Sequence, residues 1–285
     1  MMRNVRTKTA RAAVAAAVLV LAAGGAQAQE KFRVAADVGY APHVMAKPTG
    51  GVEGMNIDIG EAIAKKMGMQ LEVIDQQWSG IFAGLNAKKY DMIVAPTTIT
   101  EERAKSMLFT EGYFESEYQF VIKKGGPQVT SLDDLKGKVL SVNKGNLYDK
   151  WATEREPQYG WTVMRFDKNA DAIAAVIAGR ATANMAGSTV GGWAAKQNPM
   201  IVPSTLIIST GQVFGMAFRL DDVALRNKVE AIMECLKKDG TIAAAYEKWT
   251  GQKPGPDAVV NTIDPGFGAK GFNGYDATPH EVTCS

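Results

Sequence analysis

The 285-residue sequence predicts an α/β fold divided into two lobes. Short apolar runs alternate with amphipathic stretches from residue 32 onward, which is the pattern of strand and helix units in a parallel sheet. A break at Gly125-Gly126-Pro127 interrupts this alternation, and the same pattern then starts again. Extended segments near 118–123 and 211–217 connect the halves, so we expect two hinge strands. The predicted units are lobe 1 at 29–120 and 216–251, lobe 2 at 121–215, and a C-terminal tail at 252–285.

Residues 1–28 have the features of a secretory signal peptide. A basic start precedes the apolar run 12–23, which is too short to span a bilayer, and Ala26-Gln27-Ala28 is a cleavage site. The leader carries 4 of the 32 basic residues and none of the 30 acidic ones, so the mature chain has a net charge of 28 − 30 = −2. We therefore expect a soluble periplasmic protein, with neither nucleic acid nor an anionic membrane as its partner.

Lobe 1 begins with a strand at 32–36, and two strand–helix units follow. The helices are predicted at 59–67 and 81–87, with a strand at 71–74 between them and another at 91–95 after them. Ligands bind open α/β sheets at the carboxyl ends of the parallel strands. The loop 37–42 follows the first strand, so its side chains are expected at that edge.

The segment after the strand at 91–95 is suited to an anion. Thr100 precedes two acidic residues and is expected to cap a helix that begins at Glu101. Arg103, in the first turn, offers a planar pair of donors matched to a carboxylate. The alternative is a solvated helix arginine with no partner, and spacing alone does not distinguish the two.

Lobe 2 repeats the pattern, and the chain then returns to lobe 1. A strand is predicted at 139–142, a helix at 170–178, a strand that ends near 187 and a return strand at 211–220. Two closing helices are expected at 225–238 and 241–250. The tail that follows is rich in Gly, Pro and Asp, and is either decoration or a contact surface for a partner.

The stretch Asp91–Arg103, together with Phe109-Thr110 and Tyr113-Phe114, resembles the family 3 extracellular solute-binding proteins that feed ABC importers of polar amino acids. The similarity runs from about Phe32 to Gly251. It implies a two-lobed periplasmic binding protein fold of type II. It also implies an amino acid or related carboxylate as ligand, a membrane permease as partner, and a monomer.

The resemblance also implies site residues in lobe 1. Arg103, Thr98 and the backbone amides near Ala95 and Thr97 would hold the ligand carboxylate. The family's cleft-facing acid and aromatics correspond to the residues Asp37, Tyr40 and Trp78. From the residues alone, Asp37 could instead cap its turn, Trp78 could pack in the core, and His43 could be either a ligand contact or a loop histidine.

Two positions in lobe 2 depart from the family pattern. At the glycine turn, Asn146 replaces the usual threonine and Leu147 the next small polar residue, so one hydroxyl is lost although the backbone amides remain. Gly187 stands where the family commonly has an aspartate that holds the ligand's α-ammonium group. A buried ammonium needs a partner. The chain therefore either recruits another acid, of which Asp37 is the nearest candidate, or binds a different ligand.

Two cysteines in an exported chain predict a disulfide between Cys235 and Cys284. No metal or other cofactor is expected, because the two histidines are far apart in the sequence and no metal-ligand motif is present. The favoured function is solute binding for an ABC importer, without enzymatic activity. The alternatives are an accessory or sensory protein that docks on a dehydrogenase or receptor, and a dehydratase-like enzyme on the same scaffold.

Overall fold

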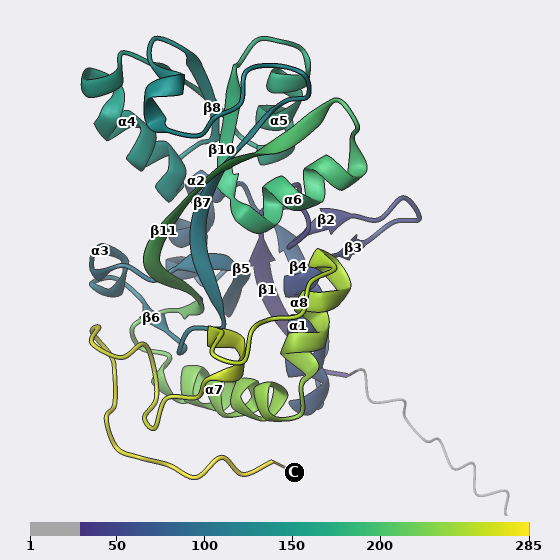
Figure 1. The fold of residues 1–285 in the computed structure, drawn as a ribbon. Helices are drawn as coiled ribbons and strands as arrows, with labels where there is room; N and C mark the ends of the chain where they lie inside the picture. The colour runs from purple at the N-terminus through teal and green to yellow at the C-terminus, as the bar shows by residue number, and fades with distance from the viewer. Residues whose placement is uncertain (1–28, 285) are drawn as a thin grey trace, which may run out of the picture.

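The computed structural model describes residues 29–284 and shows two lobes joined by two long strands (Figure 1). The signal peptide predicted at 1–28 lies outside the described residues. The lobe at the bottom of Figure 1 contains the first strands and the last helices, and the upper lobe contains the middle of the chain. The strands are β1 Lys31–Ala36, β2 Met45–Ala46, β3 Val52–Glu53, β4 Gln70–Asp75, β5 Met92–Thr98, β6 Leu108–Phe109, β7 Phe114–Lys123, β8 Val139–Asn143, β9 Thr162–Phe166, β10 Ala183–Gly187 and β11 Ile201–Phe218.

Helices cover the faces of the sheet in both lobes, as expected where parallel strands are connected by crossovers. The α-helices are α1 Met55–Lys66, α2 Trp78–Asn86, α3 Glu101–Ala104, α4 Leu147–Tyr159, α5 Asn169–Ile177, α6 Ser188–Gln197, α7 Val223–Lys238 and α8 Thr241–Thr250. Two short 3₁₀ helices lie at Leu132–Leu135 and Val259–Asn261. None of the described helices is long and apolar enough to cross a membrane.

The strands follow the order β4-β1-β5-β11-β7-β10-β8-β9 through both lobes, and β6 pairs with β11. The outer pairs are parallel: β1 pairs with β4 and β5, and β8 pairs with β9 and β10. The hinge strands β7 and β11 pair antiparallel in the middle. Two parallel halves are thus joined through an antiparallel centre, and their carboxyl ends face each other at the hinge.

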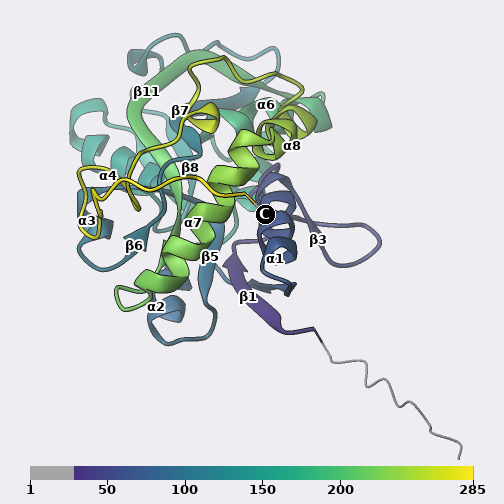
Figure 2. The ribbon, with the colours of Figure 1, turned by 90° about the horizontal axis from the view of Figure 1, so that it is seen from below.

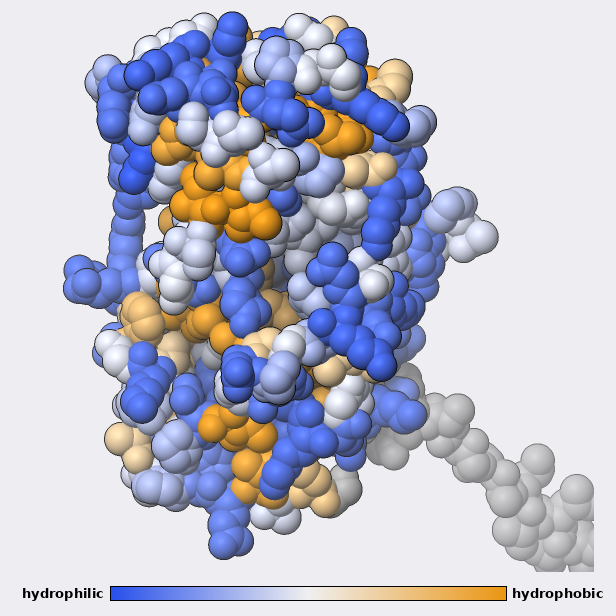
Figure 3. All heavy atoms as spheres, viewed as in Figure 1, coloured by the Kyte–Doolittle hydropathy of each residue, from blue (hydrophilic) through white to orange (hydrophobic). Residues whose placement is uncertain are grey.

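The hydrophobic core is divided in the same way as the sheet. One cluster of buried side chains takes its members from residues 32–114 and 214–269. Two further clusters take theirs from residues 118–201. On the face shown in Figure 3, hydrophilic residues cover much of the surface, and hydrophobic residues lie in separate groups.

Most elements predicted from the sequence are confirmed, including the strand at 32–36, the cap at Thr100 and the closing helices. Strand β9, helix α6 and the short strands β2, β3 and β6 were not predicted. Helix α6 contains Gly191 and Gly192, which lower its helix propensity. The return strand begins ten residues before the predicted Gly211, because β11 continues along β7 from residue 201.

The tail is held on helix α7, and its last segment crosses this helix in Figure 2. The predicted disulfide is confirmed: Cys235 of α7 is bonded to Cys284, with the two Cα atoms 5.5 Å apart. Gly268 N–H donates to Glu230 Oε1 at 2.7 Å, and His280 Nε2 lies 2.8 Å from Glu234 Oε2. The described part of the tail therefore covers a polar face of α7 in the lower lobe.

Candidate functional site

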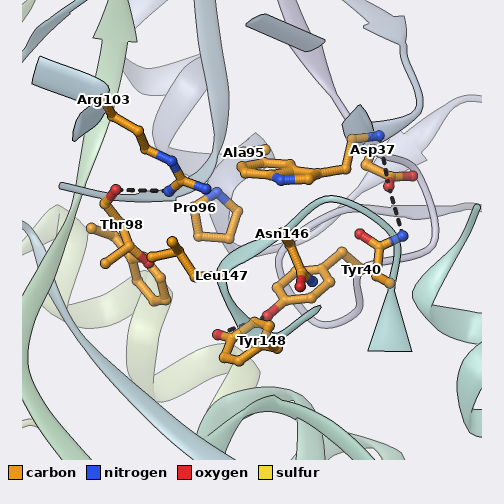
Figure 4. A pocket seen from close by; sticks show the side chains of 12 residues that line it. Asp37, Tyr40, Ala95, Pro96, Thr98, Arg103, Asn146, Leu147 and Tyr148 are labelled. Carbon is orange, nitrogen blue, oxygen red and sulfur yellow. Dashed lines mark hydrogen bonds between the residues drawn. The ribbon is translucent and has the colours of Figure 1, made fainter. Parts of the chain in front are cut away.

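A pocket lies between the lobes where the strands of both halves end (Figure 4). The lower lobe contributes the loop after β1, the start of α2, the end of β5 and helix α3. The upper lobe contributes the end of β8 and the start of α4, and β11 closes the pocket from the hinge. The lining residues are Asp37, Tyr40, Trp78, Ala95, Pro96, Thr98, Arg103, Asn143, Asn146, Leu147, Tyr148 and Phe214.

Arg103 points into this pocket from α3. The side chain of Thr100 caps the helix by accepting from Arg103 N at 3.2 Å, and Arg103 Nη1 donates to Thr98 O at 2.8 Å. The rings of Trp78 and Phe82 flank the guanidinium, with centroids 5.5 and 5.1 Å away. Burial lowers the pKa of Arg103 to about 10, so it remains a cation at neutral pH.

The charge of Arg103 has no counterion within the part of the chain that the structure describes. None of the carboxylates in residues 29–284 forms an ion pair with it. Its Nη1 is engaged by a neutral carbonyl, which leaves further N–H donors available on the pocket side. A buried cation without a partner is unfavourable, and a carboxylate of a ligand would relieve that cost.

Asp37 lies on the opposite side of the pocket in Figure 4, and it is already paired. Lys168 Nζ lies 2.8 Å from Asp37 Oδ1 and donates to Asp75 Oδ1 at 2.6 Å. Asp37 Oδ2 accepts from Trp78 N at 3.2 Å and from Asn143 Nδ2 at 3.4 Å. Burial raises the pKa of the Asp37 carboxyl, and its hydrogen bond and charge interaction with Lys168 oppose that rise.

Two tyrosines occupy the space beside Gly187. Tyr40 OH donates to Tyr148 OH at 3.1 Å across the lobes and accepts from Gly187 N at 3.4 Å. A Cβ atom at Gly187 would lie 3.0 Å from Tyr148 OH and 3.4 Å from Tyr40 OH. A larger side chain at this position would therefore have to displace the tyrosine pair, which explains why a glycine fits here.

The pocket is mostly apolar. Seven lining residues are aromatic or aliphatic with no charge: Tyr40, Trp78, Ala95, Pro96, Leu147, Tyr148 and Phe214.

Eight of the ten ligand-binding residues predicted from the sequence line the pocket: Asp37, Tyr40, Trp78, Ala95, Thr98, Arg103, Asn146 and Leu147. Thr97 does not line it; this residue is fully buried, and its hydroxyl donates to Ala95 O at 3.0 Å. Gly187 lies behind the tyrosine pair. His43 is also buried beneath the site, with Nδ1 2.8 Å from Asn56 Oδ1.

Sequence reasoning missed four lining residues, Pro96, Asn143, Tyr148 and Phe214, and the ion pair of Lys168. Tyr148 could have been found, because it belongs to the glycine turn that was already assigned to the site. Phe214 lies in the predicted return strand, but the strand pattern alone does not show which end of it meets the pocket. Lys168 precedes α5, and nothing in its local sequence indicates a partner 131 residues earlier.

The lobes are in contact around the pocket. His43 Nε2 lies 2.8 Å from Thr189 Oγ1, and Lys150 forms an ion pair with Glu102. These contacts join the tyrosine pair and the Lys168 ion pair in bridging the two halves. The structure is therefore the closed form of a two-lobed protein.

A comparison with known families identifies this architecture. The family described as bacterial extracellular solute-binding proteins, family 3, matches residues 32–252, which is most of the chain. The chain belongs to this family. The resemblance noted in the sequence is thereby confirmed, and the C-terminal tail from residue 253 onward lies beyond the matched region.

Related proteins of this family are named as binding proteins for amino acids. The L-arginine-binding protein of Pseudomonas aeruginosa is 28% identical over 82% of this chain and 93% of its own length. The L-cystine-binding protein TcyJ of Escherichia coli is 29% identical over 74% of this chain and 79% of its own length.

Solved structures have the same fold. An ancestral arginine-binding protein bound to glutamine superposes with a TM-score of 0.73 at 33% identity, over 79% of this chain and 99% of that one. The ancestral amino acid-binding protein AncCDT-1, described as a precursor of cyclohexadienyl dehydratase, has a TM-score of 0.71 at 31% identity, over 77% and 95% of the two chains.

Proposed function

We propose that this protein is the periplasmic solute-binding component of an ABC importer and that it captures a small carboxylate-bearing solute between its lobes. The observation that carries the proposal is the partly buried Arg103, which faces an interlobe pocket without a counterion among the described residues. The amino-acid-binding names of the relatives support the same class of ligand, an amino acid or a related compound.

The mechanism rests on the division of the site between the lobes, with lobe 1 at 29–120 and 216–251 and lobe 2 at 121–215. In the open form only half of the pocket is available: Arg103, Thr98 and Trp78 can bind the ligand first. Contacts from Asn146 and Leu147 form only on closure, so the ligand favours the closed form by its greater affinity for it. Closure bends the hinge strands, and a membrane permease recognises the closed protein as a monomer.

The same site is poorly suited to proton-transfer catalysis. The pKa of Arg103 is about 10, and burial raises that of Tyr40 to about 12, so neither exchanges protons readily at neutral pH. Asp37 is held by Lys168. We therefore propose binding without turnover. Incubation with cyclic hydroxy acids should leave them unchanged by mass spectrometry, and a new product would overturn this assignment.

The binding function is tested first by native mass spectrometry of the exported protein and then by a thermal-shift screen. The screen should contain amino acids and small carboxylic acids together with neutral and cationic controls. A solute at 100 times its dissociation constant stabilises the protein by about 2.7 kcal/mol, which gives a measurable rise in melting temperature. If no carboxylate raises the melting temperature while a neutral or cationic solute does, the proposal is wrong.

A further inference from the structure

We propose that the solute is a small monocarboxylate with an apolar body and no cationic group, because Lys168 of this chain already fills the role that a ligand ammonium would have. This inference rests on the proposed function and specifies its ligand class. It follows from the partners of the two charged side chains that line the pocket, Arg103 and Asp37.

Asp37 is the only carboxylate among the described residues that line the pocket. The ammonium of Lys168 lies 2.8 Å from Asp37 Oδ1, and the backbone of Trp78 and the amide of Asn143 occupy Oδ2. A ligand ammonium would therefore have to displace Lys168 or remain unpaired in a desolvated site. Both are unfavourable, since a buried charge that loses its partner costs several kcal/mol.

Several neutral side-chain oxygens of the pocket are also engaged. Asn146 Oδ1 accepts from Asp149 N at 2.8 Å, where it caps helix α4. Thr98 Oγ1 lies 2.9 Å from Ser116 Oγ, and Tyr40 is bonded to Tyr148. These oxygens already have hydrogen-bond partners, so they are poorly placed to satisfy the three N–H groups of an ammonium.

Lys168 belongs to the loop between β9 and α5 in the upper lobe, and its partners Asp37 and Asp75 belong to the lower lobe. The ion pair therefore forms as the lobes close. In this protein closure itself neutralises the acid at the pocket edge, without a positive charge from the ligand. Asp75 is 53% exposed at its side chain and remains in contact with water at the rim.

The remaining charge in the pocket is the partly buried guanidinium of Arg103. Since Lys168 and Asp37 neutralise each other, one added carboxylate would neutralise Arg103. With its carboxylate at Arg103, the ligand would extend past Leu147 towards the two tyrosines (Figure 4), and Trp78 also lines this space. These surfaces suit a short branched or cyclic hydrocarbon body.

Matched ligand pairs test the inference by titration calorimetry on the mature protein. The pairs are L-phenylalanine with 3-phenylpropanoate and L-leucine with 4-methylpentanoate, which differ only in the α-ammonium group. L-Arginine, which carries a guanidinium as well as the α-ammonium, is added as a further probe. We expect the ammonium-free acid of at least one pair to bind about tenfold more tightly than its amino acid, and L-arginine to give no heat of binding.

The variant Lys168→Met frees Asp37 and should shift the preference within each pair about tenfold or more towards the amino acid. Lys150→Met is the matched control, because Lys150 also forms an ion pair across the lobes, with Glu102, but lies away from Asp37. It should weaken both members of a pair by the same factor. If Lys168→Met fails to fold, the affinities of the wild-type protein for the two members of each pair still test the inference.

The outcomes separate this inference from the function on which it rests. Tighter binding of an amino acid, or of L-arginine, by the wild-type protein would overturn the inference and leave carboxylate capture intact. An unchanged preference in folded Lys168→Met would also overturn it. Binding of no carboxylate in either the calorimetry or the thermal-shift screen would refute the proposed function itself.

Discussion

Replacing Arg103 should weaken ligand binding while making the ligand-free protein more stable. In Arg103→Met the solute loses the charged partner of its carboxylate. Truncation of one member of a buried hydrogen-bonded charge pair costs about 2–5 kcal/mol. The dissociation constant for any carboxylate solute should therefore rise by a factor of roughly 30 to 5000.

The stability effect has the opposite sign, and its size follows from the contacts of Arg103. Burial lowers the pKa of this group to about 10, and since one pKa unit equals about 1.4 kcal/mol, the cost of burying the charge is roughly 3 kcal/mol. The hydrogen bond to Thr98 O offsets about 1 kcal/mol of this cost, and the contacts with the rings of Trp78 and Phe82 offset about 1 kcal/mol more. Removing the charge should thus stabilise the ligand-free protein by about 1 kcal/mol, or about 2–4 °C in melting temperature.

The assay is calorimetry with the best solute of the screen, together with urea unfolding in its absence. Lys105→Met is the control, because Lys105 directly follows α3, is exposed and pairs with Glu101 instead of facing the pocket. It should change neither quantity appreciably. An unchanged dissociation constant in Arg103→Met would remove Arg103 from the site, and a loss of stability would refute the argument that its burial is a cost.

Three further predictions concern pH and the tail. Burial lowers the pKa of His43 to about 4, below the ordinary 6.5, so between these pH values the unfolded chain binds more protons than the folded protein. The free energy of unfolding should therefore fall as pH drops from about 6.5 to about 4, by up to about 3 kcal/mol. Burial raises the pKa of Glu230 from 4.5 to about 8, so the protonated side chain contributes stability that is lost as pH rises between these values. Glu230→Gln should therefore raise the melting temperature more at pH 8 than at pH 5. Reducing the bond between Cys235 and Cys284, which are 49 residues apart, should lower stability by up to about 4 kcal/mol.

Urea unfolding at several pH values checks all three. His43→Gln should reduce the loss of stability between pH 6.5 and pH 4. If the loss is unchanged, groups other than His43 cause it. If Glu230→Gln raises the stability equally at pH 5 and pH 8, Glu230 is already charged in the folded protein at pH 5. For the disulfide, the double variant Cys235→Ser and Cys284→Ser should match the reduced protein; equal stability of the oxidised and reduced forms would show that the tail contributes nothing through this link.

Local signals in the sequence were sufficient for the part of the site built around Arg103. The strand end, the Thr100 cap and the arginine lie within a dozen residues, and short-range rules position them. The role of Asp37 was harder to predict. It was named as the acid that could receive a ligand ammonium, but its partner Lys168 reaches it only when the lobes close. A contact made by closure has no local pattern.

The tail illustrates a second limit of sequence reasoning. Helix α7 presents Arg226, Glu230 and Glu234, and in the sequence these residues form the solvent face of an ordinary amphipathic helix. In the structure they are almost fully buried, at 1%, 0% and 0% exposure, because the tail covers them. Only the cysteine pair indicated where the tail would attach. An exposed apolar face would have predicted that another segment packs on this helix, but the face is charged.

The sheet order also determines when the protein can be completed during synthesis. Strand β11 lies between β5 and β7, although it follows every strand of the upper lobe in the sequence. The ribosome releases the chain from its N-terminus, so β8, β9 and β10 are all available before β11 has emerged. The lower lobe, by contrast, lacks the strand that pairs with β5 and β6 until residue 218 is made. Because Phe214 on that strand closes the pocket, a nascent chain has no complete binding site until three quarters of it have been synthesised.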